Sequence, residues 1–213
     1  MPRPRFYRLP RERQRDIIVA AGKALGTGGY EGVSLNRVLE QVGLSKGAAY
    51  YYFDSKDDLI ATVCLALWDH VLKRQSLDPA SLTKESFWPS LSKVSLDLAD
   101  SVNEERWIAS AVKLIWSLPP AARKTEPLAG AFNTVIAWFA ALLQRGRELG
   151  LVRTDLPQDL LLSLIVAMDE AADRWMFDNW DETDSEAMTR HTEAMLDMYR
   201  RVLSPSGCRD DSI

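Results

Sequence analysis

Residues Leu35–Leu59 have the sequence "LNRVLEQVGLSKGAAYYYFDSKDDL", in which two short segments of helical pattern meet at a lone glycine. Ser34 precedes apolar residues at helical spacing, which predicts that it caps a first short helix. Gly43 ends that helix, and Ser45 opens a second one that closes on three consecutive tyrosines. Two short helices joined by a tight turn form a helix-turn-helix, which presents its second helix to the major groove of DNA.

The first residues of the second helix are expected to face base edges. They are Ser45, Lys46, Gly47 and Ala48. Three of them are short enough to let the helix approach the groove closely, and Lys46 is the long donor that can reach a guanine edge or a phosphate.

The three tyrosines cannot share one face, because successive helical residues point about 100° apart. We expect Tyr50 and Tyr51 to donate hydroxyl hydrogen bonds to phosphates, and Tyr52 and Phe53 to belong mostly to the core. Lys56, in the first turn of the next helix, would add a cation beside free backbone N–H groups. The alternatives are half-buried packing for the tyrosines and a solvated surface charge for Lys56.

Two further helices complete the predicted head. An apolar stripe predicts a helix from Arg11 to Leu25, which "GTGG" at residues 26–29 is expected to end. Ser55 and Asp58 resemble a capping box that opens a long amphipathic helix through Trp68. The segment "RPRFYRLPRER" before the first helix is expected to be disordered when free, with a role on DNA.

The charge distribution supports this interpretation although the net charge is -4. Residues 1–56 contain 10 Lys or Arg and 5 Asp or Glu, which leaves a balance of +5. The remaining residues carry a balance of -9, and such asymmetry is typical of a chain with a nucleic-acid-binding end.

The rest of the chain has helical periodicity throughout, with rough spans of 83–102, 104–117, 126–149, 157–178 and 184–203. The predicted fold class is therefore all-α, with a three-helix helix-turn-helix head and a helical-bundle body. We place the DNA-binding domain at residues 1–56, a ligand-binding and dimerisation domain at 57–203 and a flexible tail at 204–213.

The segment "GYEGVSLNRVLEQVGLSKGAAYYYFDSKDDLI" resembles the DNA-binding signature of the TetR family of bacterial transcriptional regulators. The resemblance covers roughly residues 11–70. It implies a homodimer that binds a palindromic operator, a small-molecule effector that weakens binding, and phosphate contacts from Ser34, Tyr50, Tyr51 and Lys56. It also places Ser45 to Ala48 on the base-reading positions. Ala49 stands where the family commonly has Leu, so the core loses volume there, and Tyr52 is expected to fill the gap.

We expect a ligand site in the body to be lined by aromatic and acidic residues. The candidates are Trp68, Trp107, Trp116, Trp138, Asp169, Asp173 and Trp175. Asp169 and Asp173 share a helix face, and carboxylates beside aromatic rings could hold a cationic ligand. The alternatives are a solvated stripe in which Glu170 or Asp173 pairs with Arg174, and packing alone for the tryptophans.

An all-α metal-dependent enzyme is the alternative function, because Asp169, Glu170 and Asp173 resemble the Mg²⁺-binding motif of prenyl-diphosphate enzymes. We expect no enzyme, cofactor or metal, since the two cysteines and two histidines form no catalytic or zinc pattern. The chain shows no signal peptide or membrane-spanning run, so a cytoplasmic regulator, a repressor, is expected.

The last two helices are predicted to form the dimer surface, because both carry apolar stripes that could pair into a four-helix bundle. The interface candidates are Leu161, Ile165, Met168, Met195, Met198 and Val202. Intramolecular packing is the alternative.

Overall fold

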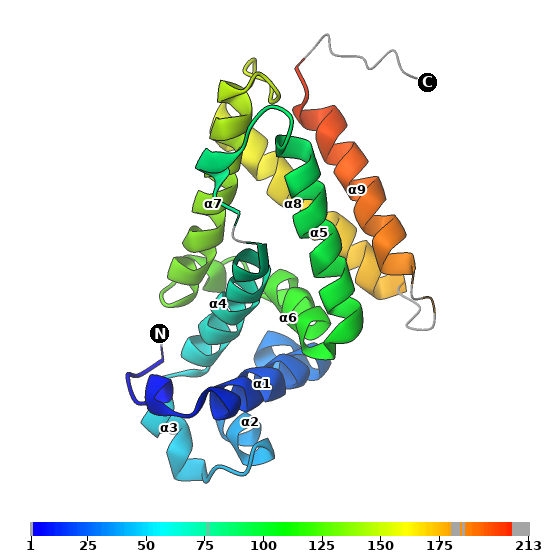
Figure 1. Ribbon diagram of the computed structural model, residues 1–213. Helices are drawn as coiled ribbons and strands as arrows, with labels where there is room; N and C mark the ends of the chain where they lie inside the picture. The colour runs from blue at the N-terminus through cyan, green and yellow to red at the C-terminus, as the bar shows by residue number, and fades with distance from the viewer. Residues whose placement is uncertain (1, 76, 180–183, 185, 206–213) are drawn as a thin grey trace. The chain divides into compact units, whose positions relative to one another are not determined.

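The computed structural model describes residues 2–75, 77–179, 184 and 186–205. Within these residues every regular element is helical, as the periodicity predicts (Figure 1). The α-helices are α1 (Arg11–Gly32), α2 (Leu35–Gln41), α3 (Ala49–Tyr52), α4 (Lys56–Gln75), α5 (Phe87–Glu104), α6 (Arg106–Ser117), α7 (Leu128–Glu148), α8 (Gln158–Asn179) and α9 (Ala187–Leu203). The predicted spans of α5 to α9 differ from these bounds by no more than four residues. None of the described helices is long and apolar enough to cross a membrane.

The chain divides into two compact units. Unit 1 contains Met1–Val71 and Ser101–Thr134, and unit 2 contains Leu72–Asp100 and Val135–Ile213. Unit 1 therefore holds the helix-turn-helix together with α6, and the residues after 56 are shared between both units. The boundaries fall inside α4, α5 and α7, so each of these helices contributes residues to both units.

The helix-turn-helix forms where the sequence predicts it. Gly43 adopts a positive φ of 74°, and its N–H donates to the Glu40 carbonyl at 3.0 Å, which closes the end of α2. A short 3-10 turn, η2 (Lys46–Ala48), then leads into α3. Val38, Leu39 and Ala49 are completely buried, so the motif is held by a small apolar core.

The expected end of the first helix at residues 26–29 was wrong, because α1 continues to Gly32. Glycine weakens a helix by only about 1 kcal/mol, so tertiary contacts can override it. Here Tyr30 supplies them: its hydroxyl donates to Asp57 at 2.9 Å, and its ring lies 4.0 Å from Lys56 Nζ. The last turn of α1 is therefore attached to the first turn of α4.

The predicted capping box at the start of α4 is formed. The Ser55 hydroxyl accepts from the Asp58 N–H at 3.2 Å, and the Asp58 carboxylate accepts from the Asp54 N–H at 2.8 Å. The carboxylate thus reaches one residue further back than in the usual box. These bonds fix the chain direction between Phe53 and α4.

Residues 2–9, which we call the arm, are folded against the head, and the expectation of disorder was wrong. Phe6 is buried and its ring centroid lies 5.2 Å from that of Phe53. Burying a phenylalanine offsets the ordering cost of a short segment, which composition alone does not reveal.

Unit 2 has its own core between α5, α7, α8 and α9. Its buried residues are Leu82, Phe87, Leu142, Leu143, Val152, Leu161, Ile165 and Leu203. Gly146 on α7 permits the closest approach in this core: a Cβ there would lie 2.4 Å from Val152 Cγ2 and 2.8 Å from Phe87 Cζ. A side chain at this position would displace both neighbours.

We predict that Gly146→Ala lowers the free energy of unfolding by about 1–3 kcal/mol, because overpacking forces neighbouring side chains from their rotamers. Urea denaturation followed by circular dichroism measures this change. Gly28→Ala is the matched control, because an added Cβ at Gly28 in α1 meets nothing within 4 Å. The control should unfold at the same or a slightly higher urea concentration, and an equal loss in both variants would contradict the packing argument.

Candidate nucleic-acid interface

The small residues predicted to read bases lie on the surface of the helix-turn-helix. Ser34 occupies the N-cap of α2 and Ser45 that of η2; both are exposed, and neither side chain bonds its own helix. Gly47 is exposed with open space around it, and Ala48 is half-buried. The side chain of Lys46 lies outside the described residues, although its backbone begins η2.

The tyrosines separate into exposed and covered positions. Tyr50 is 58% exposed and Tyr51 47% exposed. Tyr52 is partly buried and meets the Tyr51 ring edge-on at 5.1 Å, whereas Phe53 is completely buried. The hydroxyl groups of Tyr50 and Tyr51 are therefore available to a ligand such as a phosphate. The change from exposed to covered side chains along residues 50–53 is expected for a helix, because successive residues point about 100° apart.

Phe6 from the arm adds an aromatic ring to the core beside α3, and the filling of the volume at Ala49 by Tyr52 stays a prediction. Phe6 from the arm packs on Phe53 and is only 1% exposed. The sequence pattern did not predict a core position for Phe6. The available signal was an aromatic residue in a short segment bounded by Pro4 and Pro10, but no periodicity connects it with the head.

Lys56 is held by the end of α1. Its Nζ donates to the Tyr30 carbonyl at 3.2 Å, lies over the Tyr30 ring and is 3.7 Å from a Glu31 carboxylate oxygen. The lysine side chain remains 31% exposed. The contacts position the cation at the α1–α4 junction, and a phosphate contact from it stays a prediction.

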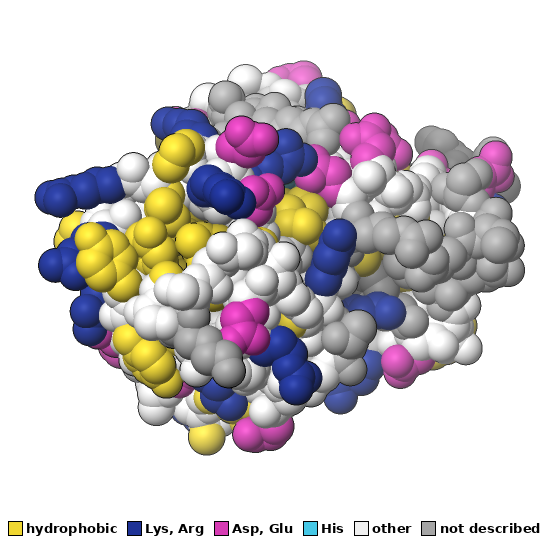
Figure 2. Space-filling model, turned by 90° about the horizontal axis from the view of Figure 1, so that it is seen from below, with side chains coloured by type: hydrophobic (Ala, Val, Ile, Leu, Met, Phe, Trp, Pro, Cys, Tyr) yellow, Lys and Arg dark blue, Asp and Glu magenta, His cyan; other side chains and the backbone are white. Residues whose placement is uncertain are grey.

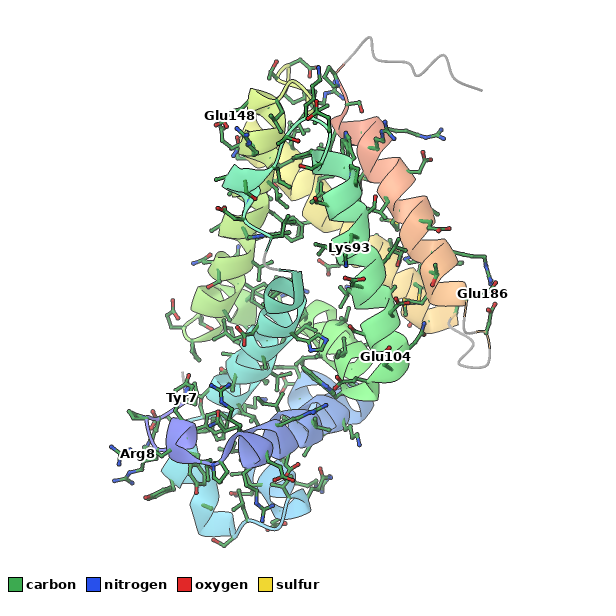
Figure 3. The ribbon with its side chains drawn as sticks, in the orientation of Figure 1. Tyr7, Arg8, Lys93, Glu104, Glu148 and Glu186 are labelled. Carbon is green, nitrogen blue, oxygen red and sulfur yellow. The ribbon has the colours of Figure 1, made fainter. Side chains whose placement is uncertain are left out.

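The arm adds basic and aromatic groups to the head. Arg5, Tyr7 and Arg8 are exposed, and Tyr7 and Arg8 point away from the head at its edge in Figure 3. The face on which α2 and α3 lie shows Lys and Arg side chains bordering side chains drawn as hydrophobic, a class that includes tyrosine (Figure 2). A surface of this composition is suited to the DNA backbone.

The candidate ligand residues of unit 1 differ in their burial and contacts. Trp107 is buried, and its indole N–H donates to the Glu105 carboxylate at 2.7 Å. Trp68 is half-buried in α4, and the side chain of Trp116 lies outside the described residues. The Trp107 bond, followed by the bond from Arg15, lowers the pKa of Glu105 and keeps this carboxylate ionised.

In unit 2, Asp169 is paired within the bundle. Its carboxylate accepts from the Tyr199 hydroxyl at 2.5 Å, which joins α8 to α9. Burial raises the pKa of Asp169, and burial together with the Asp169 charge raises the pKa of Tyr199. This half-buried carboxylate therefore bonds a side chain of the neighbouring helix.

The other unit 2 candidates lie in different environments. Trp175 is 64% exposed and stacks on His191 at 6.3 Å, whereas Trp138 is half-buried and directs its indole N–H toward the Leu77 carbonyl at 3.5 Å. Asp173 is half-buried.

The acidic motif that suggested an enzyme makes pairs with protein groups. Glu170 accepts from Arg174 at 2.8 Å, which is the pairing that the solvated-stripe interpretation predicts. Among the described residues, no group of three or more His, Cys, Asp or Glu side chains could hold a metal ion.

The predicted dimer residues divide between the core and the surface. Leu161 is 0% and Ile165 9% exposed, and both belong to the unit 2 core, so these two must be removed from the expected interface. Met168, Met195 and Val202 are half-buried, and Met198 is exposed. Leu160, Leu164 and Trp175 form the exposed side of α8 instead.

The comparisons with known proteins agree with this site. Residues 17–63 match the family described as "Bacterial regulatory proteins, tetR family". The chain is 27% identical over 156 residues to the HTH-type transcriptional repressor AcnR of Corynebacterium diphtheriae, covering 70% of this chain and 73% of that one. It is also 27% identical over 142 residues to the uncharacterized HTH-type transcriptional regulator YfiR of Bacillus subtilis, covering 65% and 67%.

Two solved structures show the same fold. One is SmeT, the repressor of the Stenotrophomonas maltophilia multidrug efflux pump SmeDEF, with a TM-score of 0.66 at 18% identity over 98% of this chain and 96% of that one. The other is the transcriptional regulator FadR from Bacillus subtilis in complex with stearoyl-CoA, with a TM-score of 0.68 at 18% identity over 89% and 98%. Residues 17–63, which contain the helix-turn-helix, therefore match the tetR family of bacterial regulatory proteins, and the all-helical fold of the chain is shared with solved regulators.

Proposed function

We propose that this regulator is a repressor that binds a palindromic operator as a homodimer and is released by a small-molecule effector. The observation that carries the DNA-binding part is the exposure of Tyr50 and Tyr51 beside small, exposed residues at the start of the recognition segment, by which we mean η2 with α3. Phenols and backbone groups contact phosphates, while Ser45 and Lys46 occupy positions that can reach base edges.

The operator is found by selecting genomic fragments that the purified chain retains. We expect selected fragments to contain an inverted repeat, and affinity to fall steeply as salt rises, because each phosphate contact releases counterions. Lys46→Ala should change the preference among operator variants. A chain that is folded yet retains no fragment at low salt would contradict the proposal.

The dimer is proposed to use the exposed side of α8. Leu160, Leu164 and Trp175 are 44%, 40% and 64% exposed, and their spacing places them along one helix face. Ala167 and Ala171 lie on the same face and are also exposed. The partner that covers this face is proposed to be a second copy of the chain. One short recognition helix reads few bases, and a two-fold pair of chains on a palindromic operator doubles the number of bases that are read.

We predict that Leu164→Glu shifts the chain from dimer to monomer, because it places a charge in the centre of the apolar face. Size-exclusion chromatography with light scattering measures the mass. Asn133→Glu, which adds the same charge at an exposed position of α7, is the control and should remain dimeric. A Leu164→Glu chain that keeps the wild-type mass would show that the interface lies elsewhere.

Effector release is proposed to act through helices that contribute residues to both units. α4 begins at Lys56 beside the recognition segment, carries the half-buried Trp68 and ends with residues of unit 2. A helix is stiff over this length, so displacement of its far end moves its first turn. The effector must prefer the displaced state for this to switch binding.

A second connection runs from α6 to α1. Glu105 accepts from Arg15 on α1 at 2.9 Å and from Trp107 at 2.7 Å. Gly22 of α1 lies against Trp107, because a Cβ there would be 3.3 Å from the Trp107 carbonyl oxygen. Movement of α6 would therefore reach the head through α1.

We predict that Trp68→Ala changes the effector concentration needed for release more than it changes DNA affinity without effector. The measurement is fluorescence anisotropy with a selected genomic fragment and a compound found by screening for its release. Glu105→Gln, tested in parallel, reports on the α6–α1 connection. A folded Trp68→Ala chain with the wild-type response would exclude transmission through this residue.

A further inference from the structure

The arm is attached to the recognition segment at defined points. Phe6 is 1% exposed and packs on Phe53 at 5.2 Å, and the Arg3 N–H donates to the Tyr52 carbonyl at 2.9 Å. Pro2 is also buried. The arm is thus ordered before any DNA arrives, and its ordering cost does not reduce the binding free energy.

The far end of the arm is fixed to α1. The Gln14 side-chain amide donates to the Leu9 carbonyl at 2.8 Å. The residues between these attachments, Arg5 to Arg8, are consequently held close to the end of α3. Their position differs from that of a free arm that orders only after it enters a minor groove.

Arg3 alters the electrostatics of the same region. Its Nε donates to Asp54 Oδ1 at 2.8 Å, and a terminal guanidinium nitrogen also donates to that oxygen. The Asp54 side chain is 62% exposed and lies two residues after the end of α3, so its charge would repel a nearby phosphate. The Arg3 guanidinium compensates this charge.

Arg5 is placed over the ring of Tyr51. The guanidinium carbon lies 4.3 Å from the ring centroid, within the range of a cation–π contact. The Tyr52 ring also contacts Tyr51 in a T-shaped arrangement, so two neighbours restrict the orientation of the phenol. Arg5 is exposed, and its guanidinium therefore carries N–H donors that solvent or a ligand can reach.

We propose that Arg5 and Tyr51 form one phosphate-binding pair, and that the folded arm is a second DNA-contacting element of the head. This inference rests on the proposed DNA-binding function and adds a partner group, a phosphate of the DNA backbone, to the arm. The guanidinium supplies a charged donor and the phenol a neutral one, and both are donors that phosphates accept. Arg5 also acts as a positioning residue, because it holds the Tyr51 ring.

The experiment uses the full chain and a fluorescently labelled random-sequence duplex of about 30 base pairs, titrated at several salt concentrations. The variants are Arg5→Gln, Tyr51→Phe, the double variant, and Arg8→Gln as the matched control. Arg8 has the same charge and lies exposed on the same arm. All three substitutions are at exposed side chains, and thermal melts establish that the four variants remain folded.

We expect Arg5→Gln to weaken binding roughly tenfold, as for loss of a charged hydrogen bond. The slope of log K against log salt should become shallower by about 0.9, the value for one phosphate contact. Arg8→Gln should cause a smaller loss. The double variant should lose little more than Arg5→Gln alone, because the two residues act as a unit.

Equal losses for Arg5→Gln and Arg8→Gln, or losses of Arg5→Gln and Tyr51→Phe that multiply in the double variant, would overturn the pair. In those cases the arm contributes only general positive charge. Failure of the wild-type chain to bind any duplex would instead overturn the proposed function, and the phosphate pair with it.

A measurement without DNA separates the two failures. In the free chain, the ring current of Tyr51 should shift the Arg5 side-chain proton resonances upfield, and Tyr51→Leu should remove the shift. Duplex binding without this shift would overturn the Arg5–Tyr51 pair alone. The shift without duplex binding would leave the contact intact and reject its role on DNA.

Discussion

The surface proposed to read DNA depends on the burial of Phe53. The recognition segment, η2 with α3, spans residues 46–52 only, which is far shorter than the helices that are stable alone in water. Its end is held instead by Phe53, which is completely buried against Phe6, and by the buried Ala49. Because helical residues are about 100° apart, fixing Ala49 and Phe53 inward turns Tyr50 and Tyr51 outward. The exposure of the phenols is therefore a consequence of packing on the opposite side.

The same constraint continues into the neighbouring helices. The capping bonds of Ser55 and Asp58 set the direction in which the chain leaves Phe53. Tyr30 then joins the end of α1 to the start of α4, through its hydroxyl to Asp57 and its ring under Lys56. These hydrogen bonds and ring contacts join defined atoms over a few ångströms. A change in the direction of α1 or α4 would therefore be transmitted to the recognition segment.

The sequence predicted features that depend on local order. Caps, the Gly43 turn and helical periodicity act within a few residues, and the helices and the helix-turn-helix were correctly predicted from them. The failures came from contacts between distant residues. The helix through residues 26–29 is stabilised by Tyr30, and the arm is ordered by Phe6. Periodicity also cannot show which part of a broad apolar helix face packs inside the same chain and which part stays on the surface. For this reason Leu161 was assigned to an interface although it is buried.

Contacts within the free chain hold the recognition segment in place before DNA binds. Amide hydrogen exchange measured residue by residue in the DNA-free chain tests it most directly. The Phe53 N–H donates to the Ala49 carbonyl at 3.0 Å, and the Arg3 N–H donates to the Tyr52 carbonyl at 2.9 Å. We expect both amides to exchange much more slowly than in an unfolded chain, to a similar degree as the amides in the middle of α1. Exchange of these two amides at unfolded-chain rates, with α1 still protected, would contradict it.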